Sequence, residues 1–161
     1  MTKVLLTIHV VAAILAIGPV AVAASMFPPA TRRARAHPDE PTATGTVRVL
    51  HRICRVYAIA GLAVPVFGLG TASAMKVLGD AWVLVSIGLT VVAAAVLITL
   101  VLPAQDAAVT ALDAGGGGDS TVARSPAPTT GQLAMFAGLF NILWVAVTVL
   151  MILRPGSTTG V

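Results

Sequence analysis

Few side chains in this sequence could bind a cofactor, and the most unusual of them is His9. It stands in the aliphatic run LLTIHVVAAILAIGP at positions 5–19. An ionisable side chain inside such a run is a candidate for function by default. Three interpretations compete for His9: part of a signal peptide, a polar group packed inside a membrane bundle, or a ligand for a cofactor.

His9 and His51 cannot bind one haem iron if both of their helices cross a bilayer. His9 lies about 9 Å inside its helix, whereas His51 lies near the opposite membrane face, on the order of 20 Å away in depth. Met75, Lys76 and Met151 lie at the same end as His9, and a His/Met pair is a known haem ligation. Haem b is therefore a candidate cofactor, with His9 as one ligand and Met75, Lys76 or Met151 as the other.

The other titratable candidates have simpler interpretations. His51 and Cys54 stand in HRICR with Arg52 and Arg55, a basic collar suited to anionic lipid headgroups. His37 lies in RAHPDE and is expected to be a solvated loop residue. We predict no role in catalysis for any of them.

No catalytic motif is present, and no metal site is predicted. The sequence has no nucleophile elbow, Walker loop or HExxH, and GGGG at 115–118 lacks the Lys-Ser/Thr of a phosphate-binding loop. The single cysteine rules out an internal disulfide and a CxxC motif. A net charge of +4 without interleaved aromatic residues does not indicate nucleic-acid binding. These absences favour a non-enzymatic protein.

The composition indicates the elements that must position these side chains. Of 161 residues, 57% are hydrophobic and 10% are charged, against roughly 25% charged in soluble domains. Four uncharged stretches are long enough to cross a bilayer, at 4–27, 56–75, 81–104 and 132–153. Only helices satisfy every backbone group within one segment, so we predict an all-α polytopic membrane protein, a bundle of four transmembrane helices in one domain.

The connecting segments complete the predicted organisation. Residues 28–46 are rich in proline and polar groups and predict a loop, and residues 76–80 predict a tight turn between antiparallel neighbours. Residues 105–131 contain DAGGGGDS and RSPAPTTG, which predict a flexible linker. Residues 47–55 are amphipathic and are expected to begin the second helix before it enters the hydrocarbon.

Charge predicts the orientation of the bundle. Seven of the ten Lys and Arg residues flank the spans on the side of the first and third loops, and three lie on the side of the termini. The positive-inside rule therefore predicts a plasma (inner) membrane protein with outward termini and with loops 28–46 and 105–131 in the cytoplasm.

The first span could also be taken for a signal peptide. Ala21-Val22-Ala23 resembles a cleavage site. However, the apolar run 4–27 exceeds the roughly 7–15 residues of a signal-peptide core, and an arginine cluster follows it. We therefore expect the span to be retained.

Small residues predict the faces on which the helices pack. Gly68 and Ala72 form a small-xxx-small pair, and Gly138 shares a stripe with Asn141. Small side chains let helix backbones approach closely in lipid. An amide near mid-span is costly unless paired, so Asn141 is expected to form an interhelical hydrogen bond, with a functional polar site as the alternative.

The order of these segments resembles a bacterial family of small predicted integral membrane proteins, domain of unknown function 2269. The resemblance rests on IHVVAAILAIGP, HRICRVYAIAGLAVPVFGLG, GDAWVLVSIGL…LVLP and MILRPG. It implies the four-span architecture and no particular activity.

A more distant likeness concerns the copper-resistance D and four-span protoporphyrinogen oxidase families. A histidine early in the first span and basic residues before the second carry this likeness. In the oxidase a first-helix histidine binds haem, a role that His9 alone could inherit, with Lys76 as a second ligand by position only. The SMFPP that ends the first span departs from the oxidase pattern.

The sequence as a whole favours a non-enzymatic membrane protein, structural or accessory to a membrane complex. Its expected partners are the lipid bilayer and a membrane-protein partner or further copies of the chain. The alternatives are a b-type haem protein or oxidoreductase that uses His9, and a copper or small-solute transporter. The transporter lacks the expected methionine-rich or charged pathway in the spans.

Overall fold

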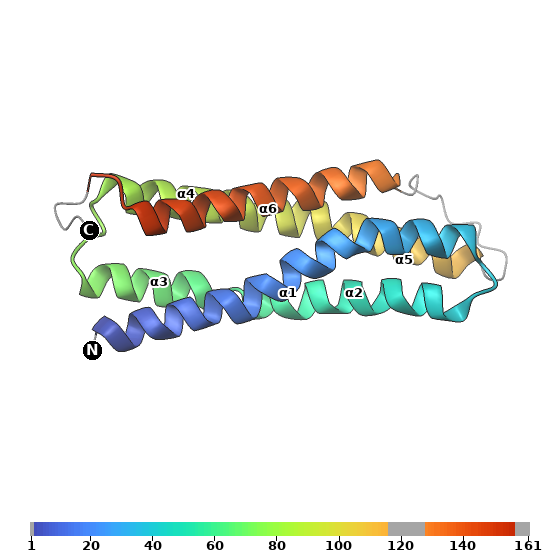
Figure 1. Ribbon diagram of the computed structural model, residues 1–161, viewed down its shortest axis with the longest axis horizontal. Helices are drawn as coiled ribbons and strands as arrows, with labels where there is room; N and C mark the ends of the chain where they lie inside the picture. The colour runs from blue at the N-terminus through green and yellow to red at the C-terminus, as the bar shows by residue number, and fades with distance from the viewer. Residues whose placement is uncertain (1, 116–127, 157–161) are drawn as a thin grey trace.

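The computed structural model describes residues 2–115 and 128–156, and this part of the chain contains helices and no strand (Figure 1). In chain order the elements are α1 (Thr2–Ala36), α2 (Pro41–Ala60), α3 (Ala63–Ala74), α4 (Ala81–Val96), the π-helical turn η1 (Leu97–Val101), α5 (Leu102–Gly115) and α6 (Thr130–Leu153). α3 continues α2, and η1 joins α4 to α5, so the elements form four rods, each long and apolar enough to cross a membrane. The predicted all-α class and four spans are confirmed.

The four rods pack unevenly. α1 packs along α2 and α3 and also contacts α6, whereas α4 packs mainly on α6 (Figure 1). α3 and α4 run antiparallel on either side of the predicted turn but make few contacts with each other. The second and third rods come together instead at their other ends, where α2 contacts α5.

The predicted loop at 28–46 is wrong, because helices occupy most of it. α1 continues to Ala36, and α2 begins at Pro41. The proline content of this segment predicted a loop, yet Pro28 and Pro29 both lie inside α1. Packing outweighs their missing backbone donors: the side chains of Phe27, Thr31 and Ala34 follow one another on one face of α1 and are all buried.

The predicted linker at 105–131 is wrong at both of its ends. Residues 105–115 belong to α5, which begins at Leu102. Residues 116–127 lie outside the described residues, and α6 begins at Thr130 behind a capping box formed by Thr129 and Gln132. The apolar positions of α5 recur at helical spacing, and the glycine and aspartate content of the segment concealed this periodicity.

The π-helical turn determines which face of α5 is buried. In an uninterrupted α-helix, Gln105 would lie about 100° around the axis from Ser86, because 19 residues separate them. A π-helical turn accommodates about one extra residue and cancels that rotation. Ser86 and Gln105 are accordingly both buried on the inner side of this rod. Pro103 supplies a physical reason for the wider turn, because its ring crowds the carbonyl of Thr99 in a normal α-helix.

The exposed surface changes character along the rods. On the second rod, Ile59 and Leu62 are 72% and 60% exposed, whereas the exposed side chains nearer the start of α2 include Arg52 and Arg55. We call the part with aliphatic exposed faces the membrane half, and residues 27–55 with 102–115 the basic extension. The extension has its own buried side chains, among them Leu50 and Ala108.

Candidate functional site

A buried polar cluster lies where α2 meets α5, and Gln105 is at its centre. The Gln105 side chain is 2% exposed, its Oε1 lies 3.3 Å from His51 Nδ1, and its Nε2 donates to Cys54 Sγ at 3.5 Å. The other ring nitrogen, His51 Nε2, lies 3.4 Å from Asp106 Oδ1. This contact does not have the geometry of a hydrogen bond, so His51 Nε2 is buried without a hydrogen-bond partner among the described residues.

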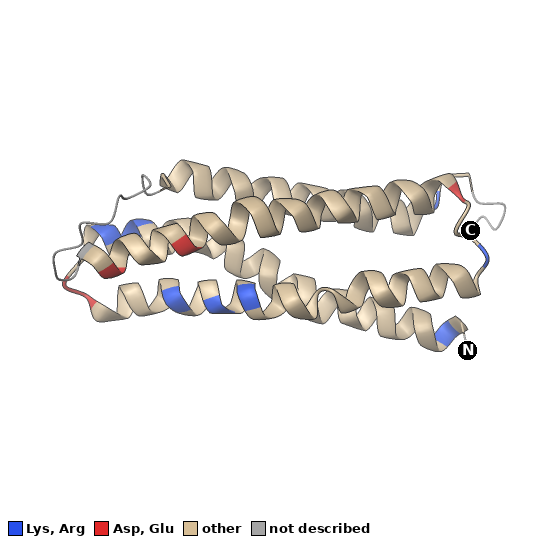
Figure 2. Ribbon diagram, turned by 180° about the vertical axis from the view of Figure 1, so that it is seen from behind, with Lys and Arg blue, Asp and Glu red and all other residues tan. Residues whose placement is uncertain are grey.

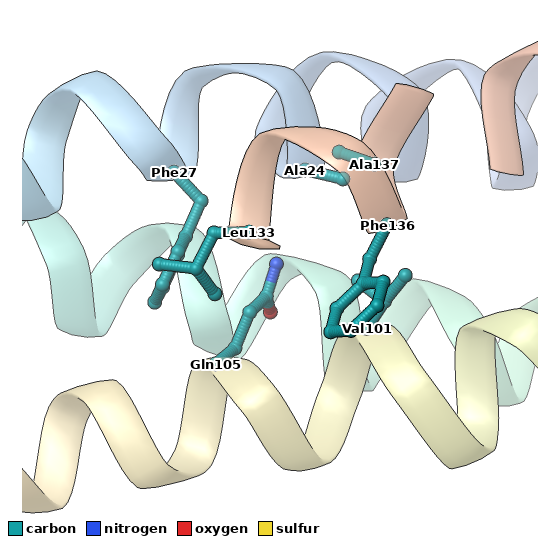
Figure 3. Close-up of a pocket in the computed structure, with 7 residues that line it drawn as sticks. All are labelled: Ala24, Phe27, Val101, Gln105, Leu133, Phe136 and Ala137. Carbon is teal, nitrogen blue, oxygen red and sulfur yellow. The ribbon is translucent and has the colours of Figure 1, made fainter. Parts of the chain in front are cut away.

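Apolar side chains close this cluster on its far side. Figure 3 shows Gln105 beside Phe27, Val101, Leu133 and Phe136. The space between these side chains is too small to hold a water molecule. The cluster therefore joins helices and offers no cavity for a substrate.

Gln105 was not predicted as a site residue, because it lies in the segment that predicted a linker. The available signal was the helical spacing of Val101, Ala108 and Leu112 around it. The basic collar predicted at the membrane surface included His51, whereas the structure buries His51 and leaves Arg52 and Arg55 exposed.

His9 lies in the membrane half, between α1 and α3. Its Nδ1 is 2.9 Å from the carbonyl oxygen of Val64, which can only accept, so Nδ1 carries the proton and donates. The ring lies directly over Gly68: a Cβ added there would come within 2.9 Å of His9 Cε1. Gly68 therefore provides the space into which His9 packs.

The other predicted haem ligands lie towards the ends of their helices. Met75 follows the last residue of α3, Lys76 adopts a left-handed backbone with φ of 58°, and Met151 lies in the last turn of α6. Among the described residues, no hydrogen bond joins any of the three to His9. In the same part of the chain, no group of three or more His, Cys, Asp or Glu side chains could hold a metal ion.

The predicted packing residues of α6 differ in their surroundings. Asn141 Nδ2 donates to Ser25 Oγ on α1 at 2.9 Å, an interhelical hydrogen bond. Asn141 Oδ1 is buried without a hydrogen-bond partner in the described chain. A Cβ added to Gly138 would meet nothing within 4 Å, so no close approach among the described residues requires glycine there. Ala72 on α3 is partly buried.

Aromatic and charged side chains mark the end of the bundle near the start of α1. Trp82 Nε1 donates to Asp80 Oδ2 at 3.1 Å, and the Arg154 guanidinium lies 5.7 Å from the centre of the Trp82 ring. Such a tryptophan, with a polar edge and a cation on its face, suits the level of lipid headgroups. Trp144 lies deeper and stacks on Phe140 at 6.5 Å.

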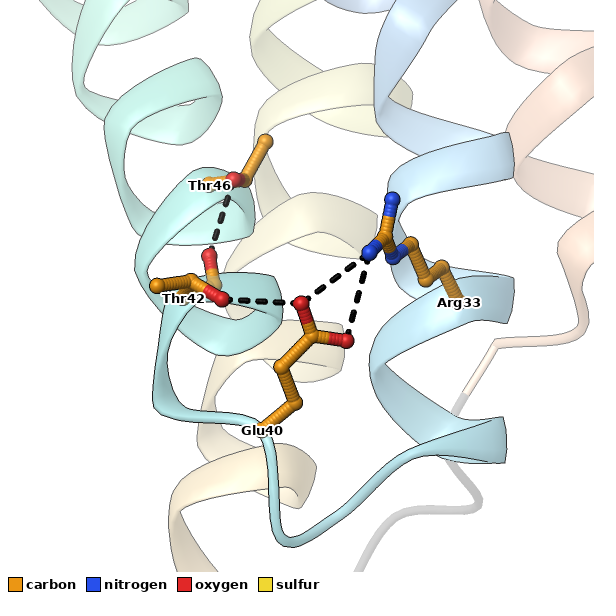
Figure 4. A network of polar contacts seen from close by, with 4 residues as sticks. All are labelled: Arg33, Glu40, Thr42 and Thr46. Carbon is orange, nitrogen blue, oxygen red and sulfur yellow. Dashed lines mark hydrogen bonds and ion pairs between the residues drawn. The ribbon is translucent and has the colours of Figure 1, made fainter.

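The opposite end of the bundle carries most of the charge (Figure 2). At its tip, residues 37–40 join α1 to α2, and Glu40 accepts from both Arg33 at 3.0 Å and Thr42 at 2.9 Å (Figure 4). The Thr42 hydroxyl, and then the Arg33 guanidinium, lower the pKa of the Glu40 carboxyl below its ordinary value. Arg35 donates to the carbonyl of Pro128 at 3.0 Å, which ties α1 to the start of the α6 segment.

The four rods, their aliphatic surfaces and the charged ends define a polytopic α-helical integral membrane protein. The chain belongs to the family described as predicted integral membrane protein (DUF2269), whose family model matches residues 3–155. No curated protein and no solved structure matches the chain. The likeness to the copper-resistance and protoporphyrinogen oxidase families therefore stays a prediction.

Proposed function

We propose that this protein is non-catalytic and acts as a structural or accessory subunit of a larger membrane complex. The observation that carries the proposal is the position of His9, whose Nδ1 donates to Val64 and whose ring packs over Gly68. The bond between Asn141 and Ser25 joins α6 to α1 in the same way. These polar side chains of the membrane half join one helix to another, as expected of a packed scaffold.

A subunit of a complex should migrate with that complex. We expect the protein, extracted from its own membranes in a mild detergent, to have a larger mass on a native gel than the recombinant chain purified alone. The comparison uses the same tagged chain and the same detergent in both samples. Equal masses in the two samples would contradict the accessory role.

The proposed location is the plasma (inner) membrane, with outward termini and the basic extension in the cytoplasm. Support comes from the exposed arginines of the extension, because cytoplasmic segments next to spans are enriched in Lys and Arg. They are Arg32, Arg33, Arg35, Arg48, Arg52 and Arg55.

Single cysteines test this orientation. Cys54 is fully buried and gives a silent background. Ala36→Cys places an exposed thiol on the extension, and Gly79→Cys places one at the opposite end. In intact cells, a membrane-impermeant maleimide should label the Gly79→Cys protein and should reach the Ala36→Cys protein only after permeabilisation. The reverse pattern would invert the topology.

One contact favours a second candidate, a b-type haem protein. Because Nδ1 of His9 carries the proton, Nε2 holds a lone pair. Histidines that bind metals usually donate their other nitrogen to a carbonyl or carboxylate in this manner. No contact in the described part of the chain favours the third candidate, transport.

A reduced-minus-oxidised absorption spectrum separates the first two candidates. The protein is expressed with ample haem and compared with His9→Ala and with His37→Ala, whose wild-type side chain is exposed. The accessory role predicts no haem band in any sample. A band that is lost only with His9→Ala would establish His9 as a ligand and replace the leading proposal.

A further inference from the structure

One face of α2 carries three exposed arginines in consecutive turns. Arg48, Arg52 and Arg55 are spaced at i, i+4 and i+7, so they point the same way from the helix. Figure 2 shows a row of Lys or Arg residues along the lower rod of the charged end. Arg48 is paired with Asp113 at 2.6 Å. Arg52 and Arg55 form no ion pair within residues 2–115 and 128–156.

The same face of the second rod becomes aliphatic immediately after Arg55. Val56, Ile59 and Leu62 are 53%, 72% and 60% exposed. At 1.5 Å per residue, Arg55 lies about 31 Å from Lys76 along the rod, which equals the thickness of a bilayer core. Arg55 and Arg52 therefore lie where the hydrocarbon ends and the lipid phosphates begin.

The neighbouring rods change from aliphatic to charged in corresponding segments. On α1 the change falls between Met26, 52% exposed, and the exposed Arg32. On the third rod it falls between Ile98, 56% exposed, and Asp106. Three rods thus mark one membrane surface. The inference that Arg52 and Arg55 lie at this surface is therefore supported by α1 and the third rod as well as by α2.

We propose that Arg52 and Arg55 together bind the phosphate of an anionic phospholipid, such as phosphatidylglycerol, in the leaflet next to the basic extension. A guanidinium has five donors in a planar fork and binds phosphate oxygens in pairs. The nearby carboxylates do not neutralise the two arginines: Asp113 is paired with Arg48, and Asp106 faces His51 at 3.4 Å. The aliphatic face beyond Arg55 then receives the acyl chains of the same lipid.

Native mass spectrometry of the detergent-purified full chain tests the proposal. Phosphatidylglycerol and phosphatidylcholine are titrated against the parent protein, Arg52→Gln/Arg55→Gln, and the control Arg32→Gln/Arg35→Gln. The control removes the same charge from the part of α1 beyond the membrane surface. We expect phosphatidylglycerol to bind about 30-fold more weakly after the first double substitution. The control should change its affinity by about twofold or less, because those charges are screened.

Three results would overturn the proposal. The first is an unchanged affinity for phosphatidylglycerol in Arg52→Gln/Arg55→Gln, and the second is an equal loss in the control, which would indicate net charge alone. The third is displacement by inorganic phosphate at the same concentration as the lipid. Arg52→Lys/Arg55→Lys guards against misfolding and should keep the helix content of the parent by circular dichroism. It should bind phosphatidylglycerol more tightly than the glutamine pair, because the charge is kept, and more weakly than the parent, because the paired guanidinium donors are lost.

Discussion

In the membrane half, exposed side chains are aliphatic and polar side chains join helices, as with His9 and Val64. In the basic extension, exposed side chains include arginines and the interior holds Leu50 and Ala108. The same continuous helices run through both parts, so the solvent distinguishes them. In water, burial of apolar surface drives packing, whereas in lipid it contributes little and close contacts and hydrogen bonds replace it.

The largest expected effect comes from replacing one leucine by alanine in each of the two parts. Leu50→Ala removes a side chain that is 7% exposed inside the extension and should lower the free energy of unfolding by about 2–5 kcal/mol. Leu84→Ala removes one that is 56% exposed on the membrane half and should cost less than about 0.5 kcal/mol. Thermal unfolding in one detergent measures both. Equal losses would remove the distinction between the two parts.

The contact between His9 and Gly68 tests packing in the membrane half. Gly68→Ala places a Cβ 2.9 Å from the His9 ring, which must shift and weaken its bond to Val64. We expect a loss of about 1–3 kcal/mol from this overpacking. Gly70→Ala is the matched control on the same helix, because its Cβ meets nothing within 4 Å.

A double-mutant cycle sharpens the result. With His9→Ala in the background, Gly68→Ala should become nearly neutral, because the ring that it displaces is gone. An equal loss with and without His9 would show that Gly68 matters for some other reason.

The bond between Asn141 and Ser25 should have a smaller effect. Asn141→Leu removes a donor 2.9 Å from Ser25 Oγ and also removes a buried oxygen without a partner. Interhelical hydrogen bonds in membranes average about 0.6 kcal/mol, so the net change in unfolding free energy should be below about 1 kcal/mol. Ser25→Ala supplies the partner deletion. A loss of several kcal/mol would point to a functional polar site.

The smallest effect concerns pH at the tip of the extension. The pKa of Glu40 is lowered by Thr42 and Arg33, so its ionised form stabilises the turn. That contribution is present above the unfolded-state pKa and is lost as the pH falls through the lowered folded-state value. Hydrogen-exchange protection of the amides in 37–42, measured against the intrinsic exchange rate at each pH, should therefore fall in acid in the parent. In Glu40→Gln this protection should depend less on pH. The same acid response in both proteins would exclude Glu40 as its source.

The sequence predicted the membrane half better than the basic extension. Helices that cross lipid require long runs of residues without charge, and these runs predicted all four spans. The extension carries charge on one face and alanine, threonine and proline on the other, and such a pattern resembles a loop. Pro28 and Pro29 are tolerated because Phe27 and Thr31 are buried beside them, a fact of tertiary packing that no local pattern contains.

The candidate site was harder to predict for a related reason. His9 is conspicuous because its neighbours are aliphatic, so the sequence directed attention to it. Its acceptor, the backbone carbonyl of Val64, carries no side-chain signal. Gln105 was concealed twice, first by the linker-like residues around it and then by the π-helical turn that rotates it inward.

The π-helical turn also affects how the third rod would respond to the loss of one residue. Because η1 absorbs about one residue relative to an α-helix, removing a single residue from Leu97–Val101 would leave a continuous α-helix. After such a deletion, Ser86 and Gln105 would be separated by 18 residues, which make five full turns at about 3.6 residues per turn. The two side chains would therefore still lie on the same face. Two versions of this chain that differ by one residue here can therefore present the same inner faces at both ends of the rod.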